Sequence, residues 1–255
     1  MSNSKAYEIN SSEFELISKQ LSESPFNVIP IHLLNRKLCR TFAINNISNF
    51  QTLIIQPNQL KSEPIAVGRN INEIAELLSI IEGWECVNVD KKISNKLSHL
   101  LSSKFNKKIK IYKDLYYTLK KIPNAQKNKP VRLLDINDLE ILSKAKPELQ
   151  GTGFKSCSEL LTEGVIAGTI IDNNLVAIAH TSAFSKNYAD VAVYTLSDYR
   201  GQGFAKAAAI LVCDKLIKQN LTPVWSCGED NFPSIKIAKN LGFEYFNNMN
   251  YLIPE

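Results

Sequence analysis

Two glycines at a predicted turn between a strand and a helix are the residues best suited to chemistry in this sequence. They are Gly201 and Gly203, in the segment Tyr199-Arg200-Gly201-Gln202-Gly203-Phe204-Ala205. A strand-like run, Ala189 to Thr195, precedes the turn, and a helix-like run, Gln202 to Gln219, follows it. The first N–H groups of a helix have no partner within the helix, and the helix dipole favours anions there. Because glycine adds no side-chain bulk, the pattern predicts a phosphate-binding turn.

Other phosphate-binding motifs do not fit this segment. The third glycine of a dinucleotide-binding fingerprint is missing, and no Gly-Lys-Ser/Thr of a P-loop follows. The glycines alone leave open a tight turn that binds nothing. A second motif is therefore needed to decide between the two interpretations.

The elements that must position this turn are short strands and helices. Before the turn, the pattern predicts a strand over Val131–Leu134, a short helix over Asn137–Lys144, and a hairpin whose strands cover residues 165–171 and 175–182. After the turn we expect a strand over Pro223–Cys227, a helix over Ser234–Asn240, and one or two strands within Phe243–Ile253.

The first half of the chain also mixes helices and strands. Ser12 and Glu15 predict a capping box at the start of a helix. Apolar periodicity predicts a helix over Asn70–Ile81, and alternation over Ile109–Leu119 predicts two strand-like runs. No set of residues in this half is typical of catalysis.

A polar segment bracketed by prolines, Ile122 to Pro130, predicts a linker. We therefore expect an N-terminal α/β domain over residues 1–121 and a second domain over residues 131–255. The linker predicts two packed units rather than one continuous sheet. We expect the first unit to cover the side of the second where an acceptor would bind.

Composition limits the function classes. No apolar run of the 255-residue chain approaches the roughly 20 residues of a membrane span. The first residues lack the apolar core of a signal peptide, so we expect a cytoplasmic protein that binds no membrane. Five cysteines without C-x-x-C spacing predict buried free thiols and no metal site.

Charge is uneven along the chain. Residues 1–128 hold 18 Lys and Arg against 11 Asp and Glu, whereas residues 129–255 hold 12 against 14. The lysines of the first half flank an alternating strand, which indicates a solvated face rather than a nucleic-acid-binding groove. The sequence leaves the oligomeric state open.

A second motif makes the glycine turn specific. The chain resembles the GNAT superfamily of N-acetyltransferases, whose Gln/Arg-x-x-Gly-x-Gly/Ala signature is met by Arg200, Gly203 and Ala205. The segment Asn231 to Phe243 is similar to the family's Asn-x-x-Ala/Ser … Lys-x-Leu-Gly-Phe segment. This resemblance implies an α+β fold, namely the GNAT acyltransferase fold with a mixed, mostly antiparallel sheet and flanking helices, preceded here by a smaller α/β domain.

Two further segments are similar to a narrower branch, the zwittermicin A resistance-like acetyltransferases. They are Tyr194 to Arg200 and Pro223 to Cys227. Glycine N-acyltransferases also resemble the chain in layout and in the Tyr-Arg-Gly-Gln-Gly segment.

The family resemblance implies acetyl-CoA as cosubstrate and an amine as acceptor. It implies that the edge of a strand pairs with the pantetheine amides, that the turn holds the pyrophosphate, and that Asn231 and Ser234 lie beside the pantetheine arm. The strand and turn residues so implied are Val193, Tyr194, Thr195, Arg200, Gly201, Gln202, Gly203, Phe204, Ala205 and Lys206.

The catalytic acid and base do not carry over from the family. Ala238 stands where many members have a Tyr that protonates the thiolate, and Ser226 stands where some have a Glu base. A Lys-like ammonium, with a pKa of about 10.4, must lose a proton before it attacks a thioester. The local candidates for proton transfer are Tyr194, Ser226 and Glu229.

The function that we expect is acetyl-CoA-dependent N-acetylation of an amine, in particular a small molecule. One alternative is an acyltransferase that conjugates larger acyl groups to an amino acid. Another is an acyl-CoA-binding module without catalysis, which the missing Tyr at Ala238 allows.

Overall fold

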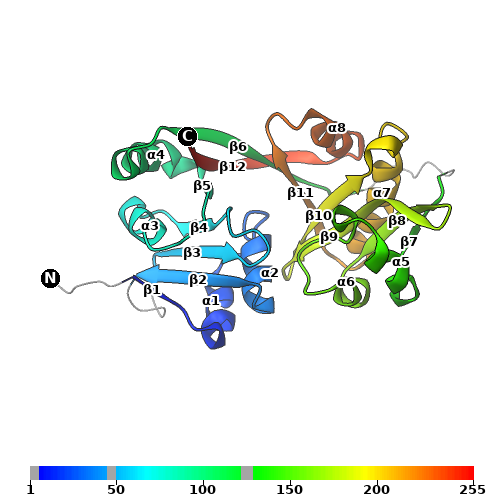
Figure 1. Cartoon of the computed structure of the whole chain (residues 1–255), viewed down its shortest axis with the longest axis horizontal. Coiled ribbons are helices and arrows are strands. Elements are labelled where there is room, and N and C mark those ends of the chain that lie inside the picture. The colour runs from blue at the N-terminus through cyan, green and yellow to red at the C-terminus, as the bar shows by residue number, and fades with distance from the viewer. Residues whose placement is uncertain (1–5, 45–49, 122–128) are drawn as a thin grey trace.

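The described strands form one continuous sheet that runs through the whole molecule (Figure 1). The computed structural model describes residues 6–44, 50–121 and 129–255. The twelve strands lie in the order β1-β2-β3-β4-β5-β12-β6-β11-β10-β9-β8-β7. Only β4–β5 and β10–β11 are parallel neighbours. The sheet is therefore mixed and mostly antiparallel, with helices on its faces, which confirms the predicted fold class.

The strands are β1 Ala6–Glu8, β2 Cys39–Ile44, β3 Thr52–Pro57, β4 Ile65–Gly68, β5 Val87–Asp90, β6 Ile109–Thr118, β7 Val131–Leu133, β8 Ile166–Ile171, β9 Asn174–Phe184, β10 Tyr188–Thr195, β11 Thr222–Gly228 and β12 Glu244–Pro254. The α-helices are α1 Phe14–Gln20, α2 Val28–Arg36, α3 Ile71–Leu78, α4 Lys91–Phe105, α5 Leu139–Lys144, α6 Cys157–Glu163, α7 Phe204–Lys218 and α8 Phe232–Asn240.

The expectation of two packed units rather than one continuous sheet is wrong. Strand β6 precedes the predicted linker, yet it lies between β11 and β12 of the second half. Strand β12, the last of the chain, pairs in turn with β5 of the first half. Figure 1 shows β6 and β12 side by side, running from α4 towards α8. The domain boundaries stay a prediction, and residues 122–128 of the linker lie outside the described residues.

Two local predictions in the first half also need correction. The run Ile109–Leu119 forms the single strand β6, because every residue from Ile109 to Thr118 pairs with β12 and the register shift of this ladder lies in β12, between Tyr245 and Asn247. The predicted capping box is wrong: Asn10, not Ser12, caps the first turn, and its side chain accepts a hydrogen bond from the Ser12 N–H at 2.9 Å. The Glu15 carboxylate pairs with Lys19 instead.

Helices cover both faces of the sheet in each half. In the second half α7 packs over a core that includes Val191, Cys213 and Trp225, and α8 adds Ala238 to the same core. Helices α5 and α6 cover the opposite face, around Ile178. In the first half, α3 and α4 lie over one apolar core, and α1 and α2 lie over the other. Among the described residues, no helix is both long enough and apolar enough to span a bilayer.

Helix α2 is a second connection between the two halves. The His32 ring nitrogen Nε2 lies 2.6 Å from the Gly153 carbonyl oxygen, in the loop before α6. The Arg36 guanidinium pairs with Glu159 at 2.7 Å and with Glu163 at 2.5 Å, and its carbon lies 4.6 Å from the centre of the Phe154 ring. Together with the hydrogen bond from the Phe184 N–H to His32 Nδ1, these contacts fix the first half against the end of β9.

Because the sheet is continuous, we expect a core change in the last strand to destabilise the first half. Leu252 of β12 is fully buried in the core beneath α3 and α4. Leu252→Ala should lower the free energy of unfolding by about 2–5 kcal/mol, since it leaves a cavity there. Leu16→Ala, at a side chain that is 51% exposed, should change it by less than about 0.5 kcal/mol. Urea titration followed by circular dichroism measures both, and two separate transitions for the two halves would contradict the expectation.

Candidate functional site

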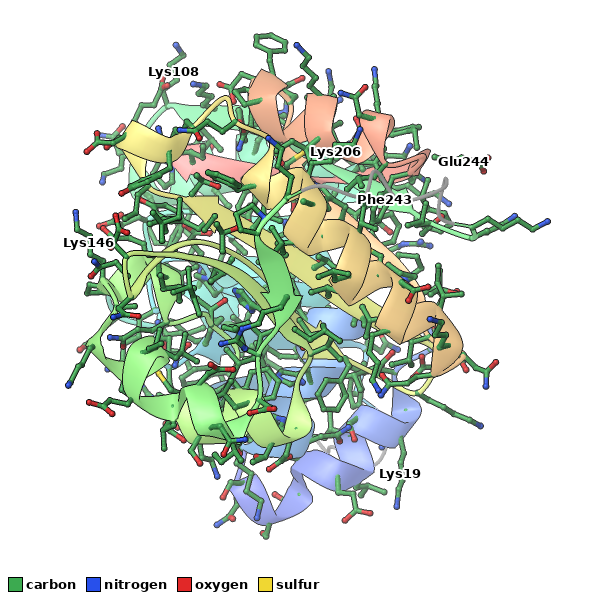
Figure 2. The ribbon with its side chains drawn as sticks, turned by 90° about the vertical axis from the view of Figure 1, so that its right-hand side faces the viewer. Lys19, Lys108, Lys146, Lys206, Phe243 and Glu244 are labelled. Carbon is green, nitrogen blue, oxygen red and sulfur yellow. The ribbon has the colours of Figure 1, made fainter. Side chains whose placement is uncertain are left out.

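The glycine turn opens α7 in a conformation that favours glycine. Gly201 and Gly203 have φ angles of 77° and 81°, in the left-handed region. Gly203 is the N-cap of α7, and no side chain caps the helix. The N–H groups of its first turn, at Phe204, Ala205 and Lys206, therefore have no partner within the helix. Figure 2 shows Lys206 at this end of α7.

The described residues leave the turn uncrowded. Of their atoms, a Cβ placed on Gly201 would meet none within 4 Å, and one on Gly203 would meet only the Lys129 Cε, at 4.0 Å. Packing does not require glycine here, so the backbone conformation does. A bare helix N-terminus with free space before it is suited to an anion.

Two cations lie at the turn, and they play different parts. Arg200 donates from Nε to the Thr195 carbonyl at 3.1 Å, so it ties the turn to the end of β10. The Lys129 ammonium lies 5.6 Å from the centre of the Phe204 ring, at the start of α7. Lys129 also lines a cavity of about 330 Å³ along β7 and β8. The sequence indicated only a linker at Lys129, so this second cation was missed.

The parallel ladder between β10 and β11 stops early. It joins only three residue pairs, and the last is Asp190 with Val224. Beyond that pair β10 continues to Thr195, while β11 continues to Gly228 alongside β6. Within the described structure, no strand pairs with this edge of β10 after Asp190. The edge that includes Val193, Tyr194 and Thr195 can therefore take an extended ligand, as strand addition does.

The side chains at this end of β10 face in two directions. Val193 packs against the core beneath α7, and Tyr194 packs against the core beneath α5 and α6. The Tyr194 hydroxyl forms no hydrogen bond with any described residue. The Thr195 hydroxyl oxygen is buried and also has no partner there.

The three predicted catalytic residues occupy separate environments. Tyr194 lies on β10, as described above. Glu229 follows β11 and pairs with Lys113 at 3.0 Å. The Lys113 hydrogen bond lowers the pKa of the Glu229 carboxyl, which makes it a weaker base. Ser226, on β11, lies beside Asp190 and favours the ionised form of that carboxyl.

The residues of the second motif hold α8 in place. The Asn231 side-chain oxygen Oδ1 accepts a hydrogen bond from the Ser234 N–H at 3.2 Å and so caps α8. The Trp225 indole N–H donates to the Ser234 hydroxyl at 2.9 Å. Ala238 is fully buried in the core beneath α7, so its position is filled by packing.

Asp190 is a site residue that the sequence did not indicate. Its side chain is 5% exposed at the point where the β10–β11 ladder ends. The Ser182 hydroxyl donates to Oδ2, while Oδ1 accepts no hydrogen bond of normal geometry from the described residues. Burial raises the pKa of Asp190 to about 6. The hydroxyls of Ser182 and Ser226 stabilise the ionised carboxylate and so oppose this rise.

Asp114 is a second missed carboxylate, and it comes from β6. Its side chain is 7% exposed and accepts a hydrogen bond from the Asn88 amide at 3.3 Å. Burial, and next the charge of Asp190, raise the pKa of Asp114 to about 7, although hydrogen bonds from Tyr116 and Asn88 oppose the shift. An acid within an otherwise alternating strand was the only signal in the sequence, and nothing there linked it to Asp190.

The first half of the chain positions Asp190 through a bulge. The register of β9 against β10 passes from Ala183 to Thr181, so Ser182 is the extra residue. A Cβ on Gly153 would lie 1.7 Å from the Ser182 carbonyl oxygen, so Gly153 packs directly against the bulge. His32 and Gln59, both from the first half, hold the Gly153 backbone.

Comparison with known proteins identifies the family. The model of the GNAT acetyltransferase family matches residues 39–252, so the chain belongs to this family. It is 29% identical over 91 residues to an uncharacterized N-acetyltransferase, YdfB, of Bacillus subtilis (strain 168). That match covers 36% of this chain and 35% of the relative.

Solved structures share the fold over nearly the full length. A GCN5-related N-acetyltransferase-like protein from Streptococcus suis 89/1591 has a TM-score of 0.69 at 18% identity, covering 96% of this chain and 99% of that one. A GNAT-family acetyltransferase from Colwellia psychrerythraea has a TM-score of 0.63 at 15% identity, covering 98% and 100%. A tandem GNAT protein from the clavulanic acid biosynthesis pathway has a TM-score of 0.59 at 10% identity, covering 97% of each chain. At these identities the likeness shows the fold alone.

The turn gives a direct test of anion binding. Gly203→Val places a β-branched side chain at a φ of 81°, and it should weaken binding of acetyl-CoA, the usual cosubstrate of the family, at least tenfold. Gly83→Val is the matched control, because Gly83 has a φ of 74° and open space around it but lies outside the site. Both variants should lose about 1–3 kcal/mol of stability through strain. Isothermal titration calorimetry should find weaker binding only in Gly203→Val, and equal affinities would refute the assignment.

Proposed function

We propose that this protein transfers an acetyl group from acetyl-CoA to the amino group of a small molecule. The observation that carries the proposal is the uncapped start of α7, which lies beside the unpaired edge of β10 in a chain of the GNAT family. A helix N-terminus suits a pyrophosphate, and a free strand edge suits the amides of a pantetheine arm.

The pyrophosphate and the pantetheine arm of acetyl-CoA each have matching groups in this proposal. The backbone N–H groups from Gly201 to Lys206 hold the pyrophosphate, and Lys129 adds a positive charge at the same turn. The β10 edge at Val193 to Thr195 pairs with the pantetheine amides. Asn231 and Ser234 shape the opposite side through α8, whose start they fix.

The chemistry adds one acyl group to the acceptor nitrogen and removes two protons from it. The ammonium gives its first proton to a base, and the free amine then attacks the thioester carbonyl. The new C–N bond forms, the C–S bond breaks, the nitrogen loses its second proton as the amide forms, and the leaving thiolate takes up one proton. Asp190 is the base that we propose, with Ser226 beside it, because a carboxyl with a pKa of about 6 is largely ionised at pH 7 yet accepts a proton more readily than an ordinary aspartate. Water or Tyr194 returns a proton to the thiolate.

The narrower assignments are also proposals. The segments Tyr194 to Arg200 and Pro223 to Cys227 support placement in the zwittermicin A resistance-like branch. The absence of a membrane-spanning helix among the described residues is compatible with the cytoplasmic location that we propose. The partners are acetyl-CoA and an amine acceptor.

Acetyl-CoA binding and turnover test the proposed function. At 100 times its dissociation constant, acetyl-CoA should stabilise the fold by about 2.7 kcal/mol, seen as a higher melting temperature. Thiol release should then require an added amine, and longer acyl-CoAs should react more slowly than acetyl-CoA. An unchanged melting temperature would refute the cosubstrate. Binding without thiol release across an amine panel would favour a non-catalytic module, and a preference for longer acyl chains with glycine would favour the amino-acid acyltransferase.

Tyr194 gives a test of how the thiolate is protonated. Its hydroxyl has no hydrogen-bond partner among the described residues, and it lies on the unpaired stretch of β10. If it is the acid, Tyr194→Phe should lower kcat about 100-fold and leave the acetyl-CoA affinity unchanged. The ring still packs against the core beneath α5 and α6 in this variant, so stability should be retained. An unchanged kcat would assign Tyr194 to packing and the proton to water.

A further inference from the structure

Buried carboxylates without basic partners gather where the two halves of the sheet meet. Asp190 comes from β10 and Asp114 from β6, and both are more than nine-tenths buried. Glu63, in the loop between β3 and β4, is half-buried, and its charge acts on Asp114. None of the three forms a salt bridge with any described Lys, Arg or His.

The groups around these acids are neutral hydrogen-bonding side chains. The hydroxyl of Tyr116 and the amide of Asn88 donate to Asp114, and the hydroxyl of Ser182 donates to Asp190. Tyr251, on β12, lies near enough for the Asp114 charge to raise its pKa. Lys113, next to Asp114 in sequence, points to the other face of β6, where it pairs with Glu229. The cluster therefore holds excess negative charge.

Buried carboxylates that lack a basic partner must either take up a proton or bind a cation from solution. Isolated carboxylates are strongly disfavoured away from water unless a partner compensates them. The Ser226 hydroxyl lies beside Asp190 and favours its ionised form, but the buried Oδ1 atom accepts no hydrogen bond of normal geometry from the described residues. Oδ1 can therefore accept a further hydrogen bond, and an ammonium group supplies up to three N–H donors together with a positive charge.

The spacing of the acids favours an organic cation over a metal ion. Within residues 6–44, 50–121 and 129–255, no group of three His, Cys, Asp or Glu side chains is placed to ligate a metal. An ammonium group needs looser convergence, since its N–H···O distances are about 2.7–3.2 Å and neutral hydroxyl or amide oxygens can accept some of its hydrogens.

We infer, building on the proposed function, that Asp114, Asp190 and Glu63 form the site for the ammonium group of the acceptor. The acceptor is then a small primary amine that has no carboxylate next to the reacting nitrogen, because the negative charge of the cluster would repel such a carboxylate. Asp190 lies at the end of the β10–β11 ladder, next to the edge where the pantetheine arm is proposed to bind. The first half of the chain thus supplies the charge that selects the acceptor, through Asp114 and Glu63.

Three matched pairs of compounds test the inferred acceptor class: tyramine with tyrosine, agmatine with arginine, and cadaverine with lysine. Each amine lacks only the carboxylate of its amino acid. We expect kcat/KM with acetyl-CoA to be at least tenfold higher for the amine in each pair that reacts. A preference for the amino acids, or the absence of binding and acetylation for every amine, would overturn the inference.

Substitution of Asp114 then tests the site. Asp114→Asn should raise KM for the amines at least tenfold, change kcat less than threefold, and shrink the preference over the amino acids. Asp214→Asn is the matched control, because Asp214 is half-exposed on α7 and pairs only with Lys218. The melting temperature shows whether the Asp114→Asn protein folds. If it folds but keeps the KM and the amine preference of the wild type, the cluster has a structural role alone and does not bind the acceptor.

Calorimetry with acetyl-CoA separates this inference from the proposed function. The acetyl-CoA affinity should be equal in the wild type, Asp114→Asn and Asp214→Asn proteins. If acetyl-CoA does not bind but amine binding weakens in Asp114→Asn, the proposed function is wrong and the cation site stands. If acetyl-CoA binds and thiol is released while Asp114→Asn behaves as the wild type, the cation site is wrong and the proposed function stands.

Discussion

The pairing of β6 with β11 and β12 is the constraint on which the rest of the structure depends. Strand β6 comes from the first half of the chain, yet it pairs along its whole length with the last strand, from Ile109–Pro254 to Thr118–Glu244. Without β6 the facing edges of β11 and β12 would carry unpaired backbone groups, which are costly when buried. Because β12 also pairs with β5, the same ladder joins the cores of both halves. The folded state of either half therefore requires the other.

The position of β6 also explains why β10 has a free edge. Strand β11 starts beside β10, and from Val224 to Gly228 its other edge pairs with β6. The backbone of β11 keeps partners there as it leaves β10, whereas β9 is the only described strand that pairs with β10 beyond Asp190. The opened edge runs towards the turn at Gly201 and Gly203, whose left-handed backbone presents the first N–H groups of α7. The cosubstrate site that we propose thus depends on a strand from the other half.

The buried acids place a second demand on the fold. Burial raises the pKa of both Asp114 and Asp190, the charge of Asp190 raises that of Asp114 further, and neutral donors hold both side chains. An apolar pair in their places would fit the surrounding cores better, since buried charges without partners destabilise a protein. The stability that the continuous sheet provides offsets this cost. Such an arrangement is typical of sites where function, rather than packing, decides the residue type.

The sequence by itself determined the elements whose signals are local. The helix after Gly203, the strand before Ser197 and the α8 segment follow from periodicity and turn residues within a few positions, and the two motifs pointed to the family that the comparison identified. Only the tertiary structure decided which strands are neighbours. A polar linker shows where the chain leaves a compact region. Strand pairing depends instead on which strand edges remain free, and the strands that pair can be more than a hundred positions apart, as Tyr117 of β6 and Trp225 of β11 are. For the same reason the sequence did not indicate the parts played by Asp114, Asp190 and Lys129, because these depend on distant partners and on burial, which only the folded chain provides.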